Sequence, residues 1–169
     1  MSLANDEYFF YILVAASAVG KSALMREMVK ENLWVGVSKY STRDVRYKDG
    51  EIDDVVKIDE KHLKGLSDYE AAQLRVDRIA KLKELCGENK GVVYYKNSNF
   101  YGIRIEEVVQ KLKINNVVAI ISDFHVIKEL KNNDYLKDRI RVLYIASTID
   151  ERELLKRFKS REAIQFDTD

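Results

Sequence analysis

The sequence predicts an α/β protein in which helices flank a central parallel sheet. Short apolar runs rich in β-branched and aromatic residues alternate with helical patterns, and this alternation is typical of a parallel sheet. The expected strands are 8–14, 34–37, 117–121 and 142–146. The expected helices are 21–32, 105–113, 125–131 and 150–159. With 169 residues, the chain fits one domain with a single core.

A segment of different character, about residues 39–101, interrupts this alternation. It contains a polar loop, a strand expected over 51–58, a long helix, and two further strands expected at 91–96 and 99–101. We interpret the segment as an inserted lobe with its own small antiparallel sheet.

The long helix of this segment has clear start and stop signals. Ser67 and Glu70 have the spacing of a capping box, and Gly87 is expected to end the helix after Cys86. The side chains expected to form its buried stripe are Tyr69, Ala72, Val76, Ile79 and Ala80. In the same way, Thr148 and Glu151 are expected to form a capping box at the start of the last helix.

Composition limits the classes of partner. Lys and Arg total 29 against 28 for Asp and Glu, so no overall charge attracts nucleic acid or an anionic membrane. The single cysteine excludes an internal disulfide, and the 2 histidines give no zinc-site spacing. No apolar run approaches the ~18 residues of a membrane span, and the chain start lacks the basic segment of a secretory signal. We expect a cytoplasmic protein without nucleic-acid or membrane partners.

The strongest motif runs from Ala15 to Ser22 and reads Ala-Ala-Ser-Ala-Val-Gly-Lys-Ser. It lies between an expected strand and an expected helix, which is the context of a phosphate-binding loop. Such a loop turns backbone N–H groups around a polyphosphate, and the N-terminus of the following helix adds positive charge. The sequence therefore predicts a three-layer P-loop NTPase fold. The residues expected at the ATP phosphates are Ala15, Ser17, Ala18, Val19, Gly20, Lys21 and Ser22.

Within this loop, Lys21 is expected to reach the β- and γ-phosphates and Ser22 to bind Mg²⁺. Ala15 stands where the strict motif has glycine. A small side chain still follows the turn if its backbone φ stays negative. The replacement is therefore compatible with phosphate binding.

Three further segments resemble the guanylate kinase family. Residues 41–53 resemble the family's loop T-T-R-x-P-R-x-G-E-x-D-G, and residues 99–102 resemble its N-[FY]-Y-G. Residues 145–161 resemble its I-A-P-P segment followed by the lid helix E-L-x-x-R-L-x-x-R. With the phosphate loop, these motifs occur in family order at near-family spacing and cover most of the chain.

The resemblance implies a single guanylate-kinase-like domain over residues 1–169. In it, residues 1–38 and 102–147 form the core, residues 39–101 the inserted lobe that binds the nucleoside monophosphate acceptor, and residues 148–169 the lid region. Family members continue beyond the lid with another strand and a helix. These two elements are expected to be missing here.

The resemblance also implies the reaction, the ATP-dependent phosphorylation of a nucleoside monophosphate, GMP or dGMP above all, with Mg²⁺ as cofactor. Catalysis of phosphoryl transfer is mainly positioning and charge stabilisation. By resemblance, Arg43 and Arg46 hold the acceptor phosphate, where a planar guanidinium makes paired hydrogen bonds. Tyr101 donates its hydroxyl to the same phosphate. Arg157 and Arg161 approach the transferring group from the lid.

The implied catalytic residues are Lys21, Arg43, Arg157 and Arg161. Asp123 matches an acidic family position and is implied either to hold Mg²⁺ through water or to contact the acceptor nucleotide. Alternatively, Asp123 caps the helix that follows it. For Arg157 and Arg161, a solvated basic face that complements the helix dipole is an equal alternative.

Some positions depart from the family pattern. The guanine-reading positions fall on Val92, Ile103 and Lys39, which would leave buried polar atoms of guanine unpaired, at about 1–3 kcal/mol each. Glu88 lies near Val92 and would substitute for it if the strand register shifted. A family aspartate falls on Ile121.

Two other functions remain open. One is that of a ribose 1,5-bisphosphate phosphokinase-like enzyme, a relative that also carries Tyr-Gly-Ile and lacks the guanine-reading groups. The other is that of a catalytically degenerate guanylate-kinase-like binding module. Such modules typically lose the phosphate loop, whereas Gly20, Lys21 and Ser22 are intact here. In either case we expect a monomer or a weak homodimer.

Overall fold

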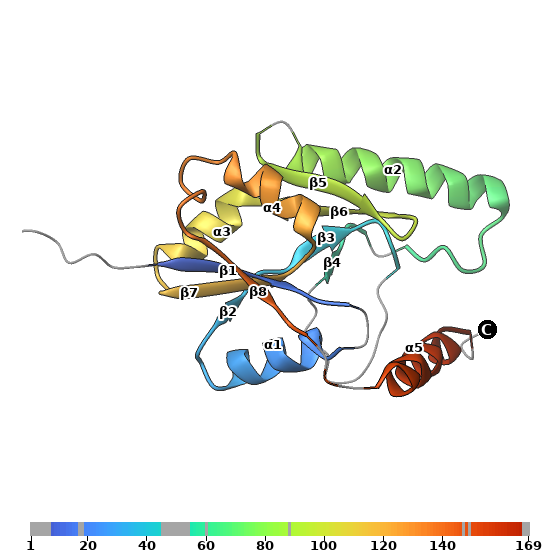
Figure 1. Ribbon diagram of the computed structural model, residues 1–169. Coiled ribbons are helices and arrows are strands. Elements are labelled where there is room, and N and C mark those ends of the chain that lie inside the picture. The colour runs from blue at the N-terminus through green and yellow to red at the C-terminus, as the bar shows by residue number, and fades with distance from the viewer. Residues whose placement is uncertain are drawn as a thin grey trace, which may run out of the picture.

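The computed structural model describes residues 8–16, 19–44, 55–59, 61–87, 89–146, 148 and 150–166, without the side chains of 125, 158 and 160–166. Its central sheet is entirely parallel, with the strand order β2-β7-β1-β8 (Figure 1). The strands are β1 (Phe9–Val14), β2 (Val35–Gly36), β7 (Val117–Ile121) and β8 (Ile140–Tyr144). The predicted α/β fold with a central parallel sheet is confirmed. Only β8 differs noticeably, because it begins and ends earlier than expected.

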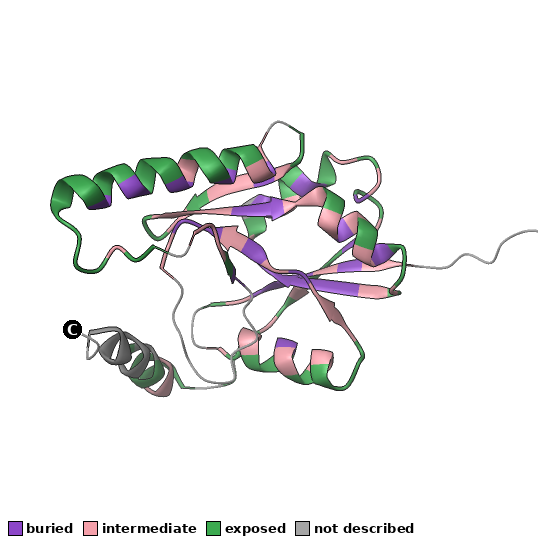
Figure 2. Cartoon of the chain, turned by 180° about the vertical axis from the view of Figure 1, so that it is seen from behind, coloured by how far each residue is buried: buried purple, intermediate pink, exposed green. Residues whose placement is uncertain are grey.

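Helices cover both faces of this sheet. The helices of the core are α1 (Lys21–Lys30), α3 (Ile105–Leu112) and α4 (Phe124–Lys131). Apolar side chains of α3 and α4 pack with Phe10, Ile12 and Val14 on one face, whereas Met25 of α1 packs with Leu13 on the other. Figure 2 shows the buried residues along the middle of the sheet. This alternation along β1 follows from the two-residue period of a strand.

A second sheet has the order β4-β3-β6-β5. Its strands are β3 (Lys39–Ser41), β4 (Val55–Lys57), β5 (Gly91–Lys96) and β6 (Asn99–Arg104). The sheet is mixed rather than antiparallel, because β3 and β4 pair in parallel while β6 is antiparallel to β3 and β5. The chain between β3 and β4 reaches the length of about a dozen residues that a parallel connection needs.

The hairpin between β5 and β6 turns through Asn97 and Ser98, whose φ values are 48° and 61°. A turn with two left-handed residues matches the twist of the flanking strands. The hairpin thereby sets the register that pairs Val92 with Ile103 and Tyr94 with Tyr101.

Helix α2 (Asp68–Cys86) covers the second sheet, and the predicted capping box of Ser67 and Glu70 is confirmed. Gly102 of β6 allows close packing, since a Cβ there would lie 2.7 Å from the Cys86 sulfur. The predicted buried stripe of α2 is wrong, because Tyr69 and Val76 are 80% and 60% exposed. The buried side chains are Ala71, Leu74, Arg78, Leu82 and Cys86. The arginine in this stripe interrupts the apolar pattern that the sequence displays.

The last helix, α5 (Glu151–Phe166), begins after Asp150. The Arg152 N–H donates to the Asp150 carboxylate at 2.9 Å, so the expected capping box of Thr148 and Glu151 is wrong. Asp150 is closer to the helix start and satisfies a free N–H of the first turn. None of the described α5 side chains is buried, and Figure 1 shows the helix standing apart from both sheets.

No helix in the described part of the chain combines the length and hydropathy that a membrane span requires.

Candidate functional site

The predicted phosphate loop begins at Ala15, directly after β1, and leads to Lys21, the first residue of α1. The Lys21 ammonium donates to the carbonyl oxygens of Ala15 and Ala16, both at 2.7 Å. Gly20 has φ 105° and ψ 17°, a left-handed conformation that favours glycine, and a Cβ there would meet nothing within 4 Å. Backbone conformation rather than space therefore requires this glycine.

The other predicted residues of the loop are placed as follows. Among the described non-glycine residues, only Asn32, Asn89, Asn97 and Ser98 have positive φ. Ala15 therefore avoids the conformation that would exclude alanine. Val19 and Ser22 flank Gly20 and Lys21 and are half-buried. Ser17 and Ala18 lie outside the described residues.

The ends of β7 and β8 lie on either side of the loop entrance. The Ser122 N–H donates to the Leu13 carbonyl at 3.1 Å, and the Ile145 N–H donates to the Val14 carbonyl at 2.9 Å. Parallel pairing thus brings Asp123, directly after β7, beside the start of the phosphate loop. Ligands of open α/β sheets bind at this carboxyl edge.

The face of the second sheet opposite α2 carries aromatic and basic side chains. Strand register places Tyr94 and Ser41 on either side of Tyr101, on one face of the sheet. The rings of Tyr94 and Tyr101 stack with centroids 5.5 Å apart and an interplanar angle of 21°. The Lys39 ammonium lies 5.9 Å from the centre of the Tyr101 ring. We call the residues Lys39, Ser41, Tyr94, Lys96 and Tyr101 the acceptor face.

This acceptor face contacts the end of β7. The Lys39 ammonium donates to the Ile121 carbonyl at 2.7 Å, and this lysine is only 8% exposed. The hydroxyls of Tyr94 and Ser122 lie 3.5 Å apart. The second sheet is thereby attached to the edge of the central sheet where the phosphate loop begins.

Asp123 takes part in the same set of contacts. Lys96 donates to its two carboxylate oxygens at 2.7 and 2.6 Å, and the side chains are 39% and 21% exposed. Asp123 occupies the N-cap position of α4, but its side chain makes no capping hydrogen bond. The capping interpretation is therefore wrong, because the carboxylate is turned toward Lys96.

The two expected Mg²⁺ ligands, Ser22 and Asp123, differ in how well they suit the ion. The Ser22 hydroxyl, next to Lys21, is a hard oxygen donor of the kind that Mg²⁺ takes with nucleotide phosphates and water. Asp123 has both oxygens bound to an ammonium group. No cluster of three or more metal-ligating His, Cys, Asp or Glu side chains occurs within the described ranges. Ser22 fits the ion, whereas Asp123 is already paired.

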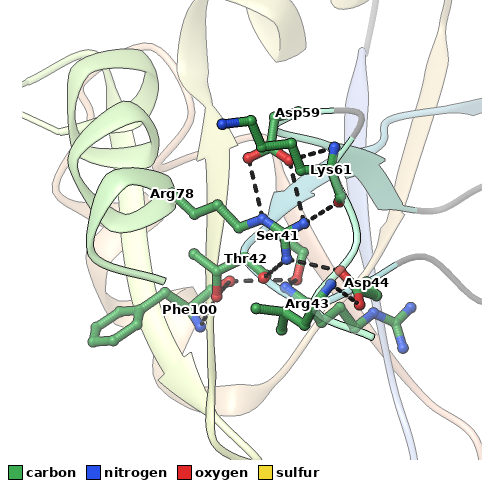
Figure 3. Close-up of polar contacts among 9 residues, drawn as sticks. Ser41, Thr42, Arg43, Asp44, Asp59, Lys61, Arg78 and Phe100 are labelled. Carbon is green, nitrogen blue, oxygen red and sulfur yellow. Dashed lines mark hydrogen bonds and ion pairs between the residues drawn. The ribbon is translucent and has the colours of Figure 1, made fainter. Parts of the chain in front are cut away.

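The loop that carries Arg43 is held by Arg78, a residue of α2 with a side chain only 3% exposed (Figure 3). Its guanidinium binds the Asp59 carboxylate through two hydrogen bonds of 3.1 and 3.2 Å. It also donates to the Asp44 carboxylate at 2.8 Å and to the Thr42 carbonyl at 2.9 Å. One buried arginine thus fixes both ends of the segment between β3 and α2.

The contacts between Arg78 and the two carboxylates stabilise the charged forms of Arg78 and Asp59. Burial alone would raise the pKa of Asp59, but the hydrogen bonds and charge of Arg78 outweigh it and leave the pKa below its ordinary value. Burial likewise opposes the charge of Arg78, and the two carboxylates raise its pKa overall. Arg78 and Asp59 are therefore both ionised at neutral pH.

Hydrogen bonds to β6 hold the other side of the Arg43 loop. The Thr42 N–H donates to the Phe100 carbonyl at 3.0 Å, and the Phe100 N–H donates to the Thr42 hydroxyl at 3.0 Å. The Arg43 Nε is buried and has no hydrogen-bond partner in the described part of the chain. Its guanidinium points away from the Arg78 cluster (Figure 3). Arg43 as a whole is only partly buried, and a ligand that accepted from this Nε would remove the cost of the unpaired donor.

Of the two predicted lid residues, Arg157 is the one whose side chain the structure describes, and it does not contact this site. Arg157 is exposed and donates to Glu153 of its own helix at 3.0 Å, four residues away. The side chain of Arg161 and all of Arg46 lie outside the described residues. Arg157 therefore has the contacts of a solvated helix face in this conformation.

The positions compared with guanine-reading residues lie in the core. Val92 and Ile103 are cross-strand partners, only 6% and 0% exposed, and both belong to the larger hydrophobic cluster. Lys39 is bound to the Ile121 carbonyl, as described above. Glu88, which would substitute for Val92, lies outside the described residues.

Sequence reasoning missed two residues of this site, Arg78 and Lys96. The period of two from Val92 through Tyr94 to Lys96 indicates that these side chains share a face, which was a usable signal. For Arg78 the signal was weaker. It consisted of the apolar residues Leu74 and Leu82, which lie at helical spacing on either side of it.

The phosphate loop between β1 and α1, the parallel order β2-β7-β1-β8 and the second sheet between β2 and α3 define a P-loop kinase fold. No protein-family model and no curated protein matches the chain. Among solved structures, the chain is similar to the guanylate kinase from Anaplasma phagocytophilum. The TM-score is 0.54 at 12% identity, over 95% of this chain and 71% of that chain. The fold is thus guanylate-kinase-like, as the motifs predicted.

Proposed function

We propose that the protein is an ATP-dependent phosphotransferase that transfers the γ-phosphoryl group of ATP to a phosphate on a small acceptor. Nucleoside monophosphates, GMP and dGMP above all, are the acceptors that the sequence motifs imply. The observation that carries the proposal is the position of the left-handed Gly20 and of Lys21 after β1, beside an attached sheet that carries Tyr101 and leads into Arg43. Such a reaction needs positive charge from two sides.

The residues divide between donor and acceptor. Lys21 and the loop backbone bind the ATP phosphates, and Arg43, Arg46 and Tyr101 bind the acceptor phosphate. The Arg43 Nε, which has no hydrogen-bond partner among the described residues, supports this role. In the reaction, an acceptor phosphate oxygen forms a bond to the γ-phosphorus while the bond to the β-phosphate oxygen breaks, leaving ADP.

The lid and the metal complete the proposal. Arg157 and Arg161 reach the transferring group when α5 moves, and no described α5 side chain would leave a core in that movement. Ser22 holds Mg²⁺, which neutralises charge on the β- and γ-phosphate oxygens when bound. The protein is further proposed to act in the cytoplasm as a monomer or a weak homodimer.

A second acceptor, ribose 1,5-bisphosphate, is favoured by one observation. Val92 and Ile103 are buried apolar residues, whereas Lys39 and Lys96 add positive charge to the acceptor face. Guanine would find no hydrogen-bonding side chain at the first two positions. The chemistry is the same, since this acceptor also offers a phosphate oxygen.

The test is a coupled assay of ADP release with ATP and Mg²⁺. GMP, dGMP, AMP, UMP, CMP and ribose 1,5-bisphosphate are the acceptors, and Lys21→Ala is the inactive variant. Turnover with one of these acceptors, abolished by Lys21→Ala, supports the proposal. ATP binding without turnover of any acceptor would refute it and favour the binding-module alternative.

A further inference from the structure

We infer that the ion pair of Lys96 and Asp123 is a latch that holds the second sheet against the central sheet before any acceptor binds. The two residues are thus positioning residues, which fix where Arg43 and Tyr101 lie relative to the phosphate loop. The inference rests on the proposed phosphotransfer and adds the means by which the acceptor site of that reaction is kept in place.

The second sheet is joined to the core of the chain at one end only. Its strand β3 begins at Lys39, shortly after β2 ends at Gly36, and its strand β6 leads at Arg104 directly into α3. Because β3 and β6 are antiparallel, these two connections lie at the same end of the sheet. The hairpin tip between Lys96 and Asn99 lies at the other end, roughly 17 Å away along β6. A rotation of the sheet about the two connections therefore moves the hairpin tip furthest.

Contacts between the second sheet and the end of β7 follow one another from the connections to the tip. Lys39, beside the connections, donates to the Ile121 carbonyl at 2.7 Å. The Tyr94 and Ser122 hydroxyls come next, 3.5 Å apart, which is long for a hydrogen bond. The ion pair follows at the tip, with distances of 2.7 and 2.6 Å from the ammonium nitrogen to the two carboxylate oxygens. Of these contacts, the ion pair acts furthest from the connections, where it opposes a rotation of the sheet most effectively.

The ion pair has the properties of a contact that persists without a ligand. The ammonium binds both oxygens of the carboxylate, so the two charges neutralise each other. The side chains of Lys96 and Asp123 are 39% and 21% exposed, so water screens the attraction only in part, while each group keeps some of its hydration. Asp123 is also the N-cap residue of α4, yet its side chain makes no capping hydrogen bond. The carboxylate therefore serves the contact with the second sheet rather than its own helix.

The latch acts on the acceptor site because the residues proposed to bind the acceptor belong to the sheet that it holds. Tyr101 of β6 pairs with Ser41 of β3, and Arg43 follows shortly after. An acceptor phosphate bound by these side chains reaches the γ-phosphate of ATP only while the sheet is held at the end of β7. The apparent affinity for the acceptor falls in proportion to the fraction of molecules in that position. Loss of the latch is therefore expected to weaken acceptor binding and to leave the chemical step unchanged.

The direct test measures the distance between the second sheet and the core with two spin labels, in the absence of any ligand. The labels are attached through Ala72→Cys on the exposed side of α2 and Lys30→Cys at the exposed end of α1. Cys86 is 0% exposed, and burial raises the pKa of its thiol to about 11, so it does not take up label. Double electron–electron resonance then gives the distribution of distances between the two helices.

Variants of the ion pair are compared on this labelled protein. Lys96→Gln and Asp123→Asn should each lengthen and broaden the distance distribution. The exchanged pair, Lys96→Glu with Asp123→Lys, should return the distribution toward that of the wild type. Lys137→Gln, which removes an ion pair with Asp134 between α4 and β8, is the matched control and should change nothing. In the wild type, raising NaCl from about 0.05 M to about 1 M should lengthen the distance, because salt screens a partly exposed pair.

The turnover assay adds a readout that a merely structural role would not move. In the unlabelled protein, with an acceptor that is turned over, Lys96→Gln and Asp123→Asn should raise KM for the acceptor about three- to tenfold and change kcat less than about twofold. The exchanged pair should restore KM, and Lys137→Gln should leave it unchanged.

Several results would overturn the inference. A distance distribution that stays the same in both single variants and at high salt would show that the ion pair is no latch. Longer distances that the exchanged pair does not shorten would show that the two side chains act separately. Longer distances with an unchanged KM, or a loss confined to kcat, would refute the positioning role. If no acceptor is turned over, the proposed function fails, and the distances still decide whether the latch exists. If the single variants do not fold, the salt series on the wild type decides it.

Discussion

The phosphate loop and the Arg43 loop hold their cations in different ways. Lys21 donates to the carbonyls of Ala15 and Ala16, which lie close to it in the sequence. The Arg43 loop is held by Arg78 of α2 and Phe100 of β6, far along the chain. The proposed donor site therefore depends on local backbone geometry, whereas the proposed acceptor site depends on tertiary structure. Substitutions should affect chemistry at the first and stability at the second.

The largest expected effect is on turnover, in Lys21→Ala. Loss of a preorganised charge at the transferring phosphates is expected to lower kcat by about 10²–10³, the range found for single transition-state donors. The melting temperature should change little, because Lys21 is only half-buried and its hydrogen bonds described above go to carbonyls of its own loop. Lys30→Ala, at the exposed end of the same helix, is the control. A melting temperature far below that of the control would contradict the proposed difference between the phosphate loop and the Arg43 loop.

The next effect is on stability, in Arg78→Met. The substitution leaves Asp59 and Asp44 without their buried partner, and breaking such a pair costs about 3–5 kcal/mol of unfolding free energy. Urea denaturation measures this loss of unfolding free energy. Arg75→Met, on the exposed face of α2, should stay within about 0.5 kcal/mol of the wild type. Similar values for the two variants would show that the network does not hold the Arg43 loop.

The same contrast explains how much of the molecule the sequence predicts. The strands of the central sheet can be recognised as short apolar runs, because the apolar residues of each strand are consecutive in the sequence. The phosphate loop is equally easy to recognise, since Gly20, Lys21 and the strand before them are close together in the sequence. The fold class therefore follows from the sequence, and so does the proposal of a donor site at this loop.

The acceptor site does not follow in the same way. Lys96 and Asp123 are 27 residues apart, and Arg78 and Asp44 are 34 apart, so no local pattern joins them. Arg78 also explains a wrong prediction. Because a charged residue interrupts the buried stripe of α2, the sequence pattern placed Tyr69 and Val76 on the buried face. Tertiary contacts decide these positions.

A smaller effect concerns pH. The pKa of Asp59 lies below its ordinary value of 3.8, so its ionised form stabilises the fold above that pH. The stabilisation is lost as pH falls below 3.8 and through the folded-state pKa. We expect the urea midpoint to fall between pH 5 and pH 3, and to fall less in Asp59→Asn, which lacks this titration. Equal slopes for both proteins would place the acid sensitivity elsewhere.

The smallest effect should come from Ser67→Ala, which removes the cap of α2. The Ser67 hydroxyl accepts from the Glu70 N–H at 3.3 Å, and the Glu70 carboxylate accepts from the Ser67 N–H at 2.9 Å. Loss of such a cap costs about 1 kcal/mol, whereas Ser67→Asn should retain most of it. Because Arg78 lies deeper in the helix, acceptor binding should not change. If Ser67→Ala weakened acceptor binding, the start of α2 as well as Arg78 would hold the Arg43 loop.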